Sequence, residues 1–298
     1  MPAFPKPDFQ YTFNLEKEIE NLKDYKKKPS RLIPKKSNSQ LLVATWNIAN
    51  LGLQKREPEH YKLLAEIISW FDFVAVQEVN DNLEGIYELK NNLSTSYSII
   101  FSDKAGNNER LCYVYNSRKI KLLELVGEIA IAPSQAKNIA LPGVGQAFKG
   151  FDRNPYLCAF SWNGIVLAFI NVHSIFGSES AQDIERRSLE AYAISRYADL
   201  EGKSKNAFTK NYICLGDFNI EKTEPGNPVY EALKSRGLTL PEHSTKIYSN
   251  INNDKQYDQI AFLPDIKRMV TGSGVFDFDG AVFSELWQES PAKFKAYL

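Results

Sequence analysis

Short apolar runs recur along the chain and are separated by polar segments, as in a protein built from many strands. The runs are rich in Val, Ile and Phe, which favour strands. They are "LLVATWN" at 41, "DFVAVQE" at 72, "RLCYVYN" at 110, "YLCAFSW" at 156, "IVLAFINVH" at 165, "NYICLGD" at 211 and "YDQIAFL" at 257. We expect each run to form a strand.

Two longer segments have apolar residues three and four positions apart, which predicts amphipathic helices. They are "EPEHYKLLAEIISWF" (57–71) and "SESAQDIERRSLEAYAISRYADL" (178–200), the second beginning with a serine suited to cap a helix. Connections of hairpin length and of helix length are interleaved, so we predict a mixed sheet in an α/β fold. No Gly/Ser linker or internal repeat divides the chain, which favours one domain over two.

The overall charge is balanced, with 36 basic and 36 acidic residues among 298. No strong positive field is therefore expected to hold a polyanion, and such a substrate would need local positive charge. The clearest basic run, "KDYKKKPSRLIPKK" at 23–36, is interpreted as part of a solvated arm leading into the domain. We place this arm at residues 1–40 and the domain at 41–298.

The cysteines indicate a reducing environment. Cys112, Cys158 and Cys214 each lie in an apolar run, where a reduced cysteine behaves as a small hydrophobic residue. The N-terminal stretch has no signal-peptide or transit-peptide pattern, and no run of 18 apolar residues predicts a membrane span. We therefore expect a soluble, cytoplasmic protein, and no segment points to a protein partner.

Polar residues stand where several predicted strands end. Asn47, Glu78, His173 and Asp217 each close an apolar run, and Asn219 follows within "GDFN". Singly, each has an ordinary alternative: a turn residue, a solvated carboxylate, a core histidine or a helix cap. Their recurrence at strand ends favours one shared site, because strand ends gather at one edge of a sheet.

These residues belong to motifs that resemble a known family. "ATWNIANLG", "FVAVQEV", "INVHS", "CLGDFNI" and "YDQIAF" are similar, in order, to signatures of the endonuclease/exonuclease/phosphatase superfamily, over about residues 41–263. "RNPYLCAF", "NVHS" and "YDQIAF" resemble its deoxyribonuclease I branch most closely. The resemblance implies an α/β four-layer sandwich, with two mostly antiparallel mixed β-sheets flanked by helices.

We expect hydrolysis of a phosphodiester bond by these residues to require a divalent cation as cofactor. A phosphodiester repels nucleophiles, and its leaving oxygen needs charge stabilisation. Mg²⁺ binds few carboxylates and prefers oxygen ligands, which suits Glu78 as the main ligand with Asn47 and Asp258 close by. We therefore expect Mg²⁺, or Mn²⁺, at these residues.

The resemblance also implies roles for the remaining candidates. Asp217 would orient or deprotonate the attacking water, and Asn219 would hold a non-bridging phosphate oxygen. His173 would donate a hydrogen bond or proton near the phosphate. Arg153, after a Gly-rich stretch and before a strand, is favoured as a phosphate-binding residue over an ordinary surface arginine. The other histidines, His60 and His243, are expected to be structural.

We predict a metal-dependent phosphodiesterase, with a nuclease acting on DNA favoured. A phosphatase for lipid or sugar phosphates is an alternative, because fold and metal site are shared within the superfamily. A catalytically impaired binding protein is another, because the family's late Ser-Asp-His is absent before Leu298. We hypothesise that Leu298 is a truncation before the strand that carries this motif, which would leave this chain nearly inactive and less stable than a longer one.

Overall fold

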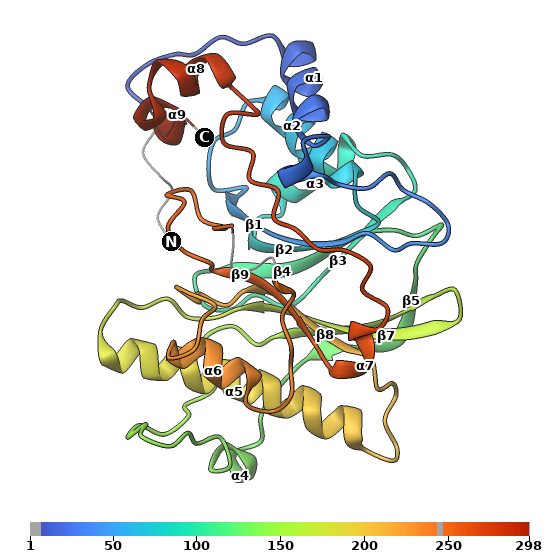
Figure 1. Cartoon of the computed structure of the whole chain (residues 1–298), viewed down its shortest axis with the longest axis vertical. Helices are drawn as coiled ribbons and strands as arrows, with labels where there is room; N and C mark the ends of the chain where they lie inside the picture. Colours follow the sequence, from blue (N-terminus) through green and yellow to red (C-terminus); the bar gives the residue numbers. More distant parts are fainter. Residues whose placement is uncertain (1–6, 243–246, 298) are drawn as a thin grey trace.

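The computed structural model describes residues 7–242 and 247–297, and two stacked β-sheets form its centre (Figure 1). The first sheet has the strand order β1-β2-β4-β3. Its strands are β1 (Val43–Leu51), β2 (Phe73–Asn80), β3 (Tyr97–Phe101) and β4 (Glu109–Asn116). β1 and β2 are parallel, and the other neighbours are antiparallel.

The second sheet follows the chain order, β5-β6-β7-β8-β9. Its strands are β5 (Lys121–Glu128), β6 (Tyr156–Trp162), β7 (Ile165–His173), β8 (Tyr212–Asp217) and β9 (Asp258–Phe262). Only β7 and β8 form a parallel pair here. Both sheets are thus mixed and mostly antiparallel.

Helices cover the outer face of each sheet (Figure 1). The first sheet is covered by α2 (Pro58–Ser69) and α3 (Glu84–Asn91). Further out, α1 (Leu15–Tyr25), α8 (Ser284–Glu289) and α9 (Pro291–Tyr297) pack on the other side of α2. The second sheet is covered by α5 (Ala181–Lys203) and α6 (Pro228–Lys234). Shorter helices are η1 (Pro29–Arg31), α4 (Pro133–Ala136) and α7 (Pro264–Lys267). The predicted four-layer sandwich is confirmed.

Aromatic side chains fill the space between the two sheets. Phe73 of β2 stacks on Phe169 of β7 with ring centroids 4.1 Å apart, and Phe160 packs edge-on against both. The Tyr113 hydroxyl, buried in this layer, donates to the carbonyl oxygen of Tyr156 at 2.7 Å, so its burial leaves no unpaired donor. This packing holds the ends of β2 and β7 in a fixed relation.

The segment before the first sheet contacts the body of the domain. Leu22 of α1 is fully buried, and Lys26 lies 4.2 Å from the ring centroid of Trp70. Arg31 forms a 3.1 Å ion pair with Asp277. The basic run 23–36 was expected to be solvated but is partly packed, because Lys26 contacts Trp70 and Arg31 pairs with Asp277.

The pattern of apolar runs correctly located most strands but missed two. β3 and β5 are short or exposed on one side, so their sequences carry few consecutive apolar residues. His60 has a structural setting, since its Nδ1 accepts from the backbone N–H of Glu57 and its ring stacks on Phe13. His243 lies outside the described residues.

Candidate active site

Three neighbouring strands of the second sheet place three titratable side chains in one row. His173 ends β7 and lies in register with Asp217, which ends the parallel strand β8. Asp217 is in turn opposite Asp258, the first residue of the antiparallel strand β9. The end of one strand and the start of its antiparallel neighbour therefore meet at the same sheet edge.

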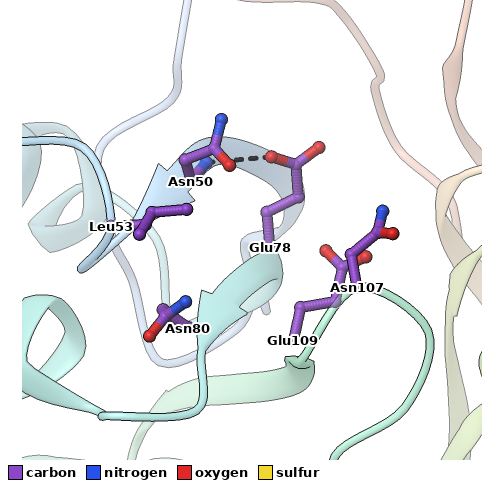
Figure 2. A pocket seen from close by; sticks show the side chains of 6 residues that line it. All are labelled: Asn50, Leu53, Glu78, Asn80, Asn107 and Glu109. Carbon is purple, nitrogen blue, oxygen red and sulfur yellow. Dashed lines mark hydrogen bonds between the residues drawn. The ribbon is translucent and has the colours of Figure 1, made fainter. Parts of the chain in front are cut away.

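The first sheet contributes Asn47 and Glu78 to the same place. Glu78 lies where β2 breaks register with both neighbours and has a positive φ of 60°. A non-glycine residue in this conformation is uncommon and costs about 1 kcal/mol or more. The Glu78 carboxylate is held by the backbone N–H of Asn50 at 2.8 Å (Figure 2). The bulge thus turns Glu78 out of the strand pattern and toward the cleft.

Asn47 joins the two sheets at the site. Its Nδ2 donates to Glu78 Oε1 at 2.9 Å and to Asp217 Oδ2 at 3.0 Å. His173 Nε2 lies 4.0 Å from Glu78 Oε1 and 3.9 Å from Asp217 Oδ2. Residues far apart in the sequence therefore converge in one cluster, as predicted, although β1 continues to Leu51 and Asn47 lies at a register break within that strand rather than at its end. Their chemical roles stay predictions.

Glu109 is a member of this cluster that the strand-end argument missed. Its Oε2 lies 3.3 Å from His173 Nδ1, and its other oxygen forms a close ion pair with Arg153. Glu109 begins β4, which is antiparallel to β2, so the start of β4 lies at the end of β2. Glu109 precedes the apolar run in "NNERLCYVY", whereas the strand-end pattern marks only residues that close such a run.

Arg153 is buried and faces the protein. Its guanidinium pairs with Glu109 and, at 3.2 Å, with Asp152 Oδ2. This geometry makes Arg153 a support for Glu109 and, through it, for His173. Its predicted contact with substrate phosphate stays a prediction, and it would require the guanidinium to exchange one of these carboxylates for the phosphate.

Buried carboxylates determine the protonation of the cluster. Burial alone would lower the pKa of His173, but the facing carboxylates of Glu109 and Asp217 outweigh it and raise that pKa. Burial, and then the charge of Asp217, raises the pKa of Asp258 well above its ordinary range. His173 is thereby favoured as a cation, and it places positive charge beside Glu78 and Asp217.

The "GDFN" stretch combines an anchor with two polar residues. Phe218 is fully buried, and the Asp217 carboxylate accepts the backbone N–H of Asn219 at 2.9 Å. Asn219, with φ 52°, makes the turn and donates from Nδ2 to the Ser174 carbonyl at 2.8 Å. Gly216 lies within β8 and does not make this turn. A Cβ there would be 2.0 Å from the Val172 carbonyl oxygen, so glycine is required by close strand approach.

A third glutamate, Glu190 of α5, binds the backbone of two segments next to the site. Its carboxylate accepts the backbone N–H of Asp152 and that of Ile175, both at 3.1 Å. The first lies beside Arg153 and the second follows His173 by two residues. Glu190 is almost fully buried, and burial raises its pKa to about 7. No sequence signal distinguished it from other helical glutamates.

We expect the stability of the protein to fall between about pH 4.5 and pH 7 because of Glu190. The folded state binds its proton more tightly than the unfolded chain, so unfolding becomes easier as the pH rises through this window. The contribution is roughly 3 kcal/mol at most. Urea unfolding of the wild type and Glu190→Gln across this range would measure it. A free-energy difference between the two proteins that does not change with pH would contradict the assignment.

The donor set of the cleft fits a hard divalent cation. Asn47 Oδ1 and Asp258 Oδ1 are buried and accept no hydrogen bond from the described residues. Ligand atoms of Glu78, Glu109 and His173 also lie within 4.8 Å of one another. Figure 2 shows Glu78 and Glu109 lining a small pocket with asparagine side chains. A donor set made mainly of carboxylate and amide oxygens, with several negative charges, is typical of Mg²⁺ or Mn²⁺ sites.

Comparisons with known proteins agree with the fold. No protein-family model matches the chain. A deoxyribonuclease of Thioalkalivibrio sp. (strain K90mix) is 28% identical over 279 residues, which cover 88% of this chain and 70% of that protein. The structure of a mannosyl-6-phosphatase of Bacteroides thetaiotaomicron is 20% identical and superimposes with a TM-score of 0.53, covering 76% of this chain and 86% of that one.

Two animal proteins give similar superpositions at 16% identity. The humanised TDP2 of D. rerio has a TM-score of 0.52 and covers 76% of this chain and 84% of its own. The human Nocturnin catalytic domain with a bound sulfate has a TM-score of 0.52 and covers 76% and 83%. The chain has the fold of the endonuclease/exonuclease/phosphatase proteins, and the resemblance inferred from its motifs is confirmed. Within residues 7–242 and 247–297, no helix is both long and apolar enough to cross a membrane.

Proposed function

We propose that this protein is a divalent-metal-dependent phosphodiesterase that cuts DNA. The observation that carries the proposal is the bridge from Asn47 to both Glu78 and Asp217, which unites the metal-binding and water-activating candidates in one cleft. The named deoxyribonuclease relative supports DNA as the substrate. The ion, when bound, would neutralise charge on the phosphate and on the leaving oxygen.

Glu78, Asn47 and Asp258 would hold the cation, because they offer oxygen donors without a full set of protein partners. Asp217 would accept a proton from water. The oxygen of that water would bond to phosphorus as the bond from phosphorus to the leaving ester oxygen breaks. Protonated His173 would donate from Nε2 to the phosphate, since its raised pKa keeps the imidazolium populated near neutral pH. Asn219 would bind a non-bridging oxygen with the amide hydrogen that Ser174 does not use.

A phosphatase is the second candidate function. The mannosyl-6-phosphatase neighbour supports it, and the same metal, aspartate and histidine could act on a phosphomonoester. The difference would lie in the loops that bind the rest of the substrate rather than in the cluster itself.

The test is an assay of the chain as its gene encodes it, with supercoiled plasmid, single-stranded DNA and mannose 6-phosphate in parallel. We expect nicking and strand cleavage in Mg²⁺ or Mn²⁺ and complete loss of both in EDTA. Cleavage that persists in EDTA would contradict the metal-dependent mechanism. Release of phosphate from the sugar, with intact DNA, would instead establish the phosphatase.

A further inference from the structure

An exposed phenylalanine lies beside the candidate active site and has no role in the mechanism above. Phe176 is 41% exposed and follows His173 by three residues. Its carbonyl oxygen accepts from Arg187 Nη1 at 2.7 Å, and the guanidinium carbon lies 5.2 Å from its ring centroid. The Arg187 side chain is only 1% exposed. A buried arginine therefore holds an exposed aromatic ring in place.

Tyr257 provides a second ring at the same place. The two ring centroids are 6.1 Å apart, and the ring planes meet at 70°. Tyr257 immediately precedes Asp258, and its carbonyl oxygen accepts the backbone N–H of Phe218 at 2.9 Å. The pair therefore flanks the row of Asp217 and Asp258 and is fixed by the same turn that places them.

We infer that Phe176, braced by Arg187 and flanked by Tyr257, is a stacking subsite for an unpaired nucleobase next to the phosphate that is cut. The inference rests on the proposed function, and it specifies single-stranded or locally opened DNA as the substrate class. Every base has an aromatic face, so stacking tolerates any sequence. Holding Phe176 rigid in advance reduces the entropy lost when a base binds.

The balanced charge of the chain is a reason to expect that DNA affinity depends on base stacking. With equal numbers of acidic and basic residues, the protein lacks the positive field that usually gives nucleic-acid affinity. Lys255, the basic side chain beside Tyr257 in sequence, is already paired with Glu179 at 3.3 Å and Glu221 at 3.7 Å. Affinity from base stacking would compensate for the weak attraction to the backbone phosphates.

The test compares two fluorescein-labelled oligonucleotides of equal length and charge. One is a thymidine dodecamer and the other has the same backbone with abasic sites throughout, and binding is measured by anisotropy in EDTA to prevent cutting. We expect the wild type to bind the thymidine strand roughly tenfold more tightly. Phe176→Leu should reduce that preference to near one while leaving the thermal midpoint of unfolding unchanged. The preference should also vary little with salt, because both strands carry equal charge.

Phe208→Leu is the matched control. Phe208 is 47% exposed and follows the far end of α5, about 24 Å along the helix from Arg187, so this variant should keep the wild-type preference. Equal affinity of the wild type for both strands, or no affinity for either, would contradict the subsite. The subsite would also be contradicted if Phe176→Leu raised KM for mannose 6-phosphate and left DNA binding unchanged. Plasmid nicking in Mg²⁺ without a base preference would retain the nuclease function and remove only the subsite.

Discussion

Replacing Asp217 with asparagine should lower kcat for DNA cleavage by about a hundredfold or more, because a positioned proton acceptor contributes on that scale. The variant should remain folded. Asparagine keeps an oxygen for the backbone N–H of Asn219 and loses only the hydrogen bond from Asn47 Nδ2, because its amide nitrogen would face that donor. Initial rates of plasmid nicking at saturating Mg²⁺ would measure the loss.

Asp265→Asn is the control for this substitution, since Asp265 is exposed on α7, which follows the end of β9 opposite to Asp258. It should leave kcat unchanged. The thermal midpoint of Asp217→Asn should fall by a few degrees at most, since one hydrogen bond from Asn47 is lost. A rate within threefold of the wild type would remove Asp217 from the mechanism, whereas a large drop in the midpoint would assign it a structural role.

Glu78→Gln should act on the metal requirement rather than on the chemical step. Glutamine keeps an acceptor for the N–H of Asn50 but loses the negative charge that attracts the cation. We expect the Mg²⁺ concentration for half-maximal cleavage to rise about tenfold or more, since even indirect supports of a metal commonly contribute that much. Rates measured across a Mg²⁺ titration would separate this shift from a loss of kcat.

The sequence allowed the fold and most of the cluster to be predicted, for identifiable reasons. Strand ends are local features, and Asn47, Glu78, His173 and Asp217 each close an apolar run. Their meeting requires only that parallel strands end at one edge and that the two sheets stack. The ordered motifs supplied the four-layer arrangement, which composition and periodicity alone do not specify.

Other features depend on tertiary contacts that no local pattern encodes. Glu109 lies in the site because β4 runs antiparallel to β2. Glu190 lies near it because α5 packs against the segments of Asp152 and Ile175, whose backbone N–H groups donate to its carboxylate. The pairing of Arg153 with Glu109 is likewise a tertiary contact, and the predicted binding of substrate phosphate by Arg153 stays a prediction. Gly216 is required by its close approach to Val172 of β7, a contact that the sequence does not reveal.

The central claim is that the cleft between Asn47, Glu78 and Asp258 binds one divalent cation, and calorimetric titration of Mg²⁺ tests it most directly. The wild type should bind one ion in the cleft, and Glu78→Gln should bind it about tenfold or more weakly. Glu88→Gln, at an exposed position of α3, should bind Mg²⁺ as the wild type does. Unchanged Mg²⁺ affinity in Glu78→Gln would contradict the account.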